Sequence, residues 1–249
     1  MKNLYSLIFT IFVLFSCSTN DSSQSLEQLS EDEALIKREV LTKLNGDTIS
    51  VDFSYDGNRL TSAKSSDGYE FNYIYENDLL SQVDLFQDGT ILIYVELTYE
   101  IARLSSYTSY FSNDIAERFD FTYNSENSIL VKRYSGNYTS QNYQNDIDIV
   151  LENQNIKSVT SSEYSVQYTY DSSNSIYKNI FAIDVLNYIG LDFGGFEGVS
   201  NNPTSRSRVY LSESESQTFT HTYNSIDFPA TTDVYLEGNL EGTIEYFYE

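Results

Sequence analysis

The chain of 249 residues is strongly acidic, with a formal net charge of -23, and it contains one cysteine, one histidine, no tryptophan and 23 tyrosines. A surface of this charge repels phosphate groups, which excludes nucleic acid as a partner. A single cysteine excludes disulfide bonds within the chain, and a single histidine excludes a metal site built from several histidines.

The first residues have the pattern of a bacterial export signal. Lys2 precedes an apolar run, residues 4–15, which at about a dozen residues is too short to cross a membrane as a helix. The run ends in "LFSC", which resembles the bacterial lipobox, and this resemblance implies that residues 1–16 are removed and that Cys17 carries lipid. The alternative is an ordinary cleaved signal that leaves a free thiol at this position.

The next segment, residues 17–34, is polar and acidic and contains few large apolar side chains. Such a segment cannot bury enough surface to order itself, so we expect a flexible tether between Cys17 and the folded part. A short helix over residues 26–35 is the alternative for part of it. We expect residues 35–249 to form a single domain.

Beyond the tether, apolar and polar residues alternate, which is typical of strands with one buried face. In "TISVDFSY" one face carries Ile49, Val51, Phe53 and Tyr55. The same alternation recurs in "YEFNYIY", "TILIYVELTY", "RFDFTY" and "EYSVQYTY". Asn-Gly and Asp-Gly pairs, which favour tight hairpin turns, lie between several of these segments. The sequence therefore predicts an all-β fold, an antiparallel up-and-down meander.

The alternation stops at residues 177–198, "YKNIFAIDVLNYIGLDFGGFEG". We predict that this segment is a short helix or coil plug inside a strongly curved sheet or incomplete soluble barrel. A membrane-spanning barrel is the alternative, because its strands alternate in the same way. Tyrosine hydroxyls on the apolar face would fit poorly against acyl chains, and the chain ends in Glu249 rather than an aromatic residue. Both features favour the soluble form.

Several stretches carry a resemblance to known proteins. They are the lipobox with its acidic tether, "YDGNRLTSA", "YTYDSSNSIYKN", "SNNP", and the close from "HTYNSIDFPATTDVY" to "TIEYFY". Together they resemble a family of uncharacterised Bacteroidetes lipoproteins with a porin-like β fold, and the strand-turn units are similar to YD-type repeats. The resemblance implies an envelope location and a curved β architecture, and it carries no catalytic residues to this chain.

Few residues suggest chemistry. His221 shares a strand face with aromatic residues, which favours a buried or half-buried position in a sheet. Calcium is the metal that the oxygen-rich segments 145–148 and 171–175 would suit, although both also fit ordinary turns. We therefore predict no metal or cofactor, with calcium as the alternative. The candidate ligand-binding residues are tyrosines in less regular stretches: Tyr134, Tyr138 and Tyr143. Rim packing is the alternative role for these three side chains.

These observations predict a non-enzymatic, lipid-anchored protein of the outer membrane that faces the periplasm or the cell surface. We expect it to contact the membrane through its anchor and to bind a glycan or a protein. One alternative is a structural or accessory envelope component without a ligand. A more distant alternative is a hydrolase that uses two carboxylates.

Overall fold

The computed structural model describes residues 29–193, 197–211 and 213–249. The predicted signal, the predicted lipidation site Cys17 and most of the predicted tether lie outside the described residues. The last residues of the predicted tether are described, and residues 31–33 form a turn. No helix in the described part of the chain has the length and apolar character needed to span a membrane.

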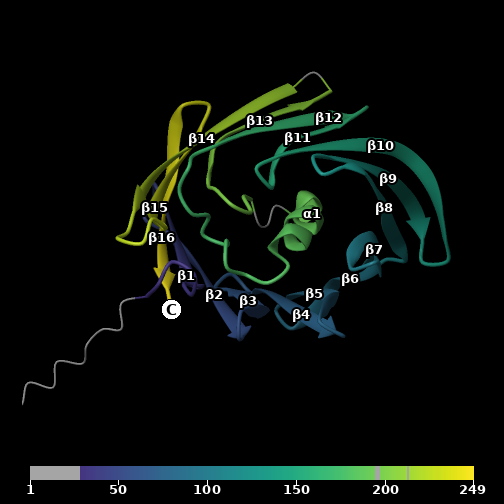
Figure 1. Ribbon diagram of the computed structural model, residues 1–249, viewed down its shortest axis with the longest axis horizontal. Helices are drawn as coiled ribbons and strands as arrows, with labels where there is room; N and C mark the ends of the chain where they lie inside the picture. Colours follow the sequence, from purple (N-terminus) through teal and green to yellow (C-terminus); the bar gives the residue numbers. More distant parts are fainter. Residues whose placement is uncertain (1–28, 194–196, 212) are drawn as a thin grey trace, which may run out of the picture.

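Sixteen strands in the described residues form one antiparallel sheet in chain order. Because β1 also pairs with β16, the sheet closes into a barrel (Figure 1). The elements are β1 (Ile36–Lys43), β2 (Thr48–Asp56), β3 (Arg59–Ser65), β4 (Tyr69–Glu76), β5 (Leu79–Gln87), β6 (Thr90–Glu100), β7 (Arg103–Phe111), β8 (Ile115–Ser125), β9 (Ser128–Asn137), β10 (Ser140–Glu152), β11 (Asn155–Ser161), β12 (Tyr164–Tyr170), α1 (Ile183–Phe193), β13 (Pro203–Tyr210), β14 (Glu213–Tyr223), β15 (Pro229–Leu236) and β16 (Asn239–Tyr248). The predicted all-β meander is confirmed, and its curvature extends to complete closure.

The even number of strands places the two ends of the barrel sequence side by side. Leu35 and Glu249 exchange two backbone hydrogen bonds, with N–O distances of 3.0 and 2.9 Å. We call this end of the barrel the terminal rim, and it also carries the turns that follow β2, β4, β6, β8 and β10. The opposite end, which carries the turns after the odd-numbered strands, is the distal rim.

The predicted plug is confirmed as a helix inside the barrel. Figure 1 shows α1 within the ring of strands, and its Leu186 has no exposed surface. The ring of Tyr188 on α1 lies 5.9 Å from that of Phe121 on β8. Apolar side chains on the inner faces of β2 to β12 pack with the helix into one core. The burial of this apolar surface is what holds the helix in place.

The remaining strands line the interior differently. On β14 to β16 the inward-facing Gln217, His221, Val234 and Tyr246 are only half-buried. His221 has both ring nitrogens in contact, Nδ1 at 2.8 Å from Thr232 Oγ1 and Nε2 at 2.8 Å from the Pro203 carbonyl oxygen. These contacts are those of a structural residue in a sheet, as the sequence predicted.

The repeated strand-turn unit of the sequence builds the terminal rim. Four tyrosines near the ends of even-numbered strands donate their hydroxyls to a backbone carbonyl 19 residues earlier, at 2.8–3.0 Å. The donors and acceptors are Tyr55 to Ile36, Tyr99 to Leu80, Tyr123 to Leu104, and Tyr248 to Pro229. Each bond joins the end of one strand to the start of the strand before it, so the repeated unit fastens neighbouring strands together at this rim.

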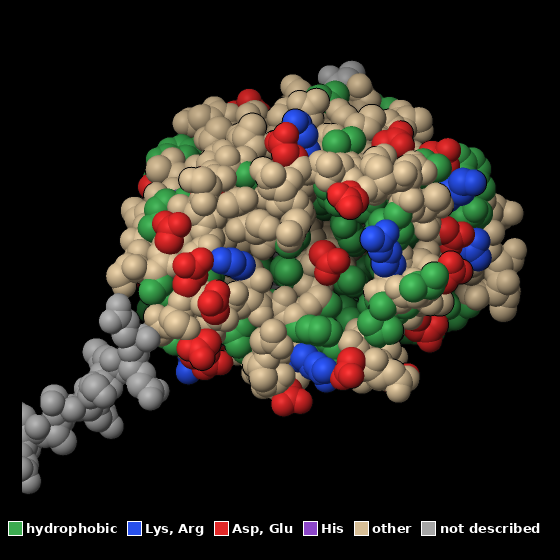
Figure 2. All heavy atoms as spheres, in the orientation of Figure 1, with side chains coloured by type: hydrophobic (Ala, Val, Ile, Leu, Met, Phe, Trp, Pro, Cys, Tyr) green, Lys and Arg blue, Asp and Glu red, His purple; other side chains and the backbone are tan. Residues whose placement is uncertain are grey.

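The outer face carries the charge. Arg38 and Asp52 pair across β1 and β2 at 2.5 Å. Figure 2, which looks onto one end of the barrel, shows acidic side chains scattered around that end. Apolar side chains show around the hollow near the centre of the same view. The apolar side of the alternating pattern is thus turned inward, and the polar side is turned outward.

Candidate functional site

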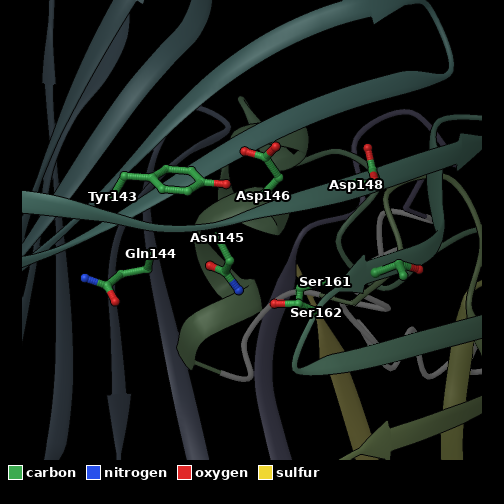
Figure 3. A pocket seen from close by; sticks show the side chains of 8 residues that line it. Tyr143, Gln144, Asn145, Asp146, Asp148, Ser161 and Ser162 are labelled. Atoms are coloured by element: carbon green, nitrogen blue, oxygen red, sulfur yellow. The ribbon is translucent and has the colours of Figure 1, made fainter.

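A step in the distal rim creates a cleft of about 440 Å³. The β9–β10 hairpin extends beyond β11, because β10 pairs with β9 from Ser140 but with β11 only from Ile147. Residues 140–146 of β10 therefore have a neighbouring strand on one side only among the described residues. The cleft (Figure 3) is lined by Tyr143, Gln144, Asn145, Asp146, Asp148, Thr160, Ser161 and Ser162.

A β-bulge sets the directions of the side chains in the cleft. The register between β9 and β10 shifts between Tyr143 and Asn145, which leaves Gln144 as the extra residue. As a result Tyr143 and Asp146 project on one side of β10, and Asn145 projects on the other, toward Ser161 (Figure 3). One short stretch thus presents groups from both faces of the sheet to the same cleft.

Asn145 is the most unusual group in the cleft. Its residue is 6% exposed, yet neither its Nδ2 nor its Oδ1 has a hydrogen-bond partner among the described residues. Its cross-strand neighbour Arg133 instead binds Glu117, with a nitrogen–oxygen distance of 2.7 Å. A buried amide without partners costs free energy, about 1–3 kcal/mol, unless a ligand or water satisfies it.

One of the three predicted tyrosines, Tyr143, lines the cleft, and a second, Tyr134, packs against it. Tyr143 is 53% exposed, and its ring meets that of Tyr134 edge-on at 5.9 Å. The guanidinium carbon of Arg118 lies 4.3 Å from the centre of the Tyr134 ring on its neighbouring strand. Partial desolvation and a hydrogen bond with Asp146 raise the pKa of Tyr143 above its usual value. Tyr134 therefore supports the ring of Tyr143, and the ring of Tyr143 is the one exposed at the cleft.

The third predicted tyrosine, Tyr138, does not line the cleft. It lies in the β9–β10 turn, where its hydroxyl donates to the carbonyl of Phe111. Its ring meets that of Tyr110 edge-on at 5.3 Å. These contacts fit the rim-packing role that the sequence left open.

The two segments considered for calcium are arranged as ordinary structure. In residues 145–148 the side chains alternate across the sheet, so Asn145 lies on one face of β10 and Asp146 and Asp148 lie on the other. In the second segment, Asp171 accepts hydrogen bonds from the backbone of Ser173 and Asn202 and from the Tyr223 hydroxyl. The described residues contain no group of three or more His, Cys, Asp or Glu side chains placed to hold a metal ion.

Glu39 is an acid on the inner face of the barrel wall. Glu39 on β1 accepts a hydrogen bond of 2.7 Å from the hydroxyl of Tyr177, in the loop that leads to α1. Burial raises the pKa of Glu39 to about 7, and the hydrogen bond from Tyr177 opposes this shift. This contact fastens the loop before α1 to the barrel wall.

The residue that sequence reasoning missed is Asn145. A signal for it was present, because Asn145 occupies the same strand face as Ile147 and Ile149, both buried. An amide at an apolar position of an alternating strand predicts either a structural partner or a ligand. The sequence alone does not show which of the two applies.

A second cleft of about 310 Å³ lies at the same rim, between β13 and β15. It is lined by Arg208, Tyr210, Glu213, Ser214, Glu215, Leu236 and Glu237. Its side chains are more exposed than Asn145, with Tyr210 at 50%. This cleft holds no buried polar atom without a partner among the described residues, so it is the weaker candidate.

The fold is similar to those of solved structures. No protein-family model matches the sequence, and no curated protein is similar to it in sequence. A porin-like protein from Bacteroides vulgatus ATCC 8482 is similar in structure, with a TM-score of 0.57 and 12% identity, over 87% of this chain and 99% of that one. A porin-like protein from Bacteroides uniformis ATCC 8492 has a TM-score of 0.53 and 12% identity, over 89% and 99%. The chain therefore has a porin-like β fold.

Proposed function

We propose that this protein is a lipid-anchored component of the cell envelope that binds a neutral glycan in the cleft beside β10. The observation that carries the proposal is the buried Asn145 amide, which has no partner among the described residues and lies beside the exposed ring of Tyr143. Binding sites commonly combine an apolar platform with a few convergent polar groups.

The chemistry of the cleft suits sugar hydroxyl groups, which both donate and accept hydrogen bonds. The Asn145 amide can do the same, and Asp146 and Asp148 can accept. The ring of Tyr143 offers a flat surface for the apolar face of a sugar. A net charge of -23 disfavours an anionic ligand, so we propose a neutral one.

The open edge of β10 raises the alternative of a protein partner that adds a strand. Two features of this edge disfavour such strand addition. Bulges and charged residues on an edge strand are the usual means of blocking it. The bulge at Gln144 interrupts the edge, and the exposed Asp146 lies just beyond it. We therefore favour a glycan over a peptide.

Hydrolysis is the second candidate, because Asp146 and Asp148 lie two residues apart on one strand and share its outer face. Both carboxylates are exposed, whereas a general acid for glycoside hydrolysis depends on burial to raise its pKa. We propose binding without turnover. Release of new reducing ends from a bound polysaccharide, lost in Asp146→Asn, would contradict this part of the proposal.

The location rests on the sequence. The single Cys17 at the end of an apolar signal, and the resemblance to Bacteroidetes lipoproteins with a porin-like fold, support a lipid anchor in the outer membrane. On this proposal, Cys17→Ala releases the protein from the membrane fraction. Membrane retention of that variant equal to the wild type would reject the anchor.

Binding is tested with protein that starts at residue 18 and so carries no lipid, applied to an array of neutral glucans, mannans, xylans and galactans. We expect one class to bind and Tyr143→Ala to abolish that binding. Tyr210→Ala is the matched control, since Tyr210 is equally exposed but lies in the second cleft. No binding to any neutral polysaccharide would favour a structural role without a ligand.

A further inference from the structure

The outer face of the barrel carries an unbroken row of side chains that begins at the cleft and crosses six strands. Cross-strand pairing joins its members from β10 to β5: Tyr143, Tyr134, Arg118, Thr108, Glu96 and Gln82. Neighbouring strands lie about 4.8 Å apart, so the row is about 24 Å long. A single sugar in the cleft would contact only its first member.

The borders of this row differ from the row itself. On the distal side a ridge of aromatic rings stands beside it, with Tyr94 stacked on Tyr110 at 4.6 Å and Tyr138 set against Tyr110. On the other side the next row is charged at its cleft end, where Asp120 lies opposite Lys132 and Lys132 lies opposite Asp146 in the strand register. The row between them combines aromatic and hydrogen-bonding side chains, including the charged Arg118 and Glu96.

We infer that the ligand is a linear, neutral polysaccharide that runs across the strands along this row, with one unit in the cleft. The inference rests on the proposed function. The ring of Tyr143 and the guanidinium of Arg118 provide flat surfaces, and Thr108, Glu96 and Gln82 provide hydrogen bonds farther along. Arg118 forms an ion pair with Asp120 at 3.1 Å, so its positive charge is already balanced and does not require an anionic ligand.

The test is calorimetric titration of the lipid-free protein with oligosaccharides of two to eight units, taken from the gluco-, manno- and xylo-series. We expect binding to strengthen with length until the row is covered, by about tenfold or more between two and six units. The double variant Gln82→Ala/Thr108→Ala should lose about tenfold for the longer oligosaccharides and keep wild-type binding of the shortest that binds. Thr122→Ala, also on the outer face of β8 but outside the row, is the control.

The outcomes separate this inference from the proposed function. Equal affinity for short and long oligosaccharides, with Tyr143→Ala still inactive, would overturn the row and keep the cleft. An unchanged length dependence in the double variant would likewise overturn the row. Failure of every oligosaccharide and of every polysaccharide on the array would reject the proposed function, and the row with it.

Discussion

The two rims of the barrel use similar residues for opposite purposes. At the terminal rim, four tyrosine hydroxyls each bind a backbone carbonyl, and Asn155 has all of its side-chain polar atoms in contact, whereas the Tyr75 hydroxyl there has no hydrogen-bond partner among the described residues. At the distal rim, the amide of Asn145 has no partner among the described residues, and Tyr143 is open. Satisfied polar groups stabilise a fold, whereas unsatisfied ones are kept where a ligand completes them. The satisfied groups at the terminal rim fit a structural role, and the open groups at the distal rim support the proposed binding site.

The largest expected effect comes from one substitution made at both rims. Asn155 is 1% exposed, and its Oδ1 accepts from the backbone nitrogens of Val199, Ser200 and Asn201 at 2.9–3.3 Å. Asn155→Leu leaves these donors unpaired, and we expect a loss of about 2–4 kcal/mol in the free energy of unfolding.

The same change at the distal rim, Asn145→Leu, removes an amide that has no partner to lose. We expect it to be neutral or to stabilise the protein by up to about 1 kcal/mol while abolishing glycan binding. Urea unfolding of both variants measures the contrast. Equal losses of stability at the two positions would show that Asn145 is structural.

Glu39 makes the stability of the barrel depend on pH. The pKa of Glu39 is raised from 4.5 to about 7, so folding favours its neutral form. Its contribution to stability is fully present below about pH 4.5 and is lost as the pH rises through about 7. We expect the wild type to lose about 1–3 kcal/mol relative to Glu39→Gln between pH 5 and pH 8. Parallel pH profiles of the two proteins would contradict the burial of this charge.

A smaller contrast is expected between tyrosines of the two rims. Tyr123→Phe removes the hydroxyl that donates to Leu104 at 3.0 Å, which should cost about 0.5–1.5 kcal/mol. Tyr143→Phe, at the distal rim, should change stability by less than about 0.5 kcal/mol. Thermal unfolding of the pair measures the difference, and a larger cost for Tyr143→Phe would reverse the assignment.

The smallest effect concerns the β6–β7 turn at the terminal rim. Ile101 and Ala102 have φ angles of 48° and 61°, a conformation that a β-branched residue adopts only under strain. Ile101 is also fully exposed. Replacing the pair by Asn-Gly should stabilise the protein by about 0.4–1 kcal/mol, with no change in binding at the other rim. A loss of stability would mean that the side chains of Ile101 and Ala102 make contacts that outweigh the strain of their backbone conformation.

Local patterns predicted much of this fold. Alternation at residues such as Val51, Phe53 and Tyr55 specified the strands and their inward face, and loss of alternation marked the segment that contains α1. Closure was not predictable, because the pairing of β1 with β16 joins residues about 200 positions apart, such as Ile36 and Tyr248. The hydrogen bonds of the repeated tyrosines were also hidden, since a sequence shows the repetition but not the carbonyl that each hydroxyl meets.

The candidate site was predicted in part. The structure brings Tyr134 and Tyr143 together and gives Tyr138 a packing role. The cleft depends on the unequal lengths of β10 and β11 and on a bulge, and neither has a clear signature in the residues themselves. Asn145 was visible as a polar residue at an apolar position, but its missing partner is a property of the folded neighbourhood.

The even strand count also sets where the N-terminal end of the barrel lies relative to the cleft. Both ends of the barrel sequence meet at the terminal rim, and the cleft opens at the distal rim, at the other end of β10. That strand has 13 residues, about 40 Å of extended chain. A lipid on Cys17 would therefore be attached at the end of the barrel opposite the cleft. A long polymer could then be captured from the surrounding medium without entering the gap beneath the protein.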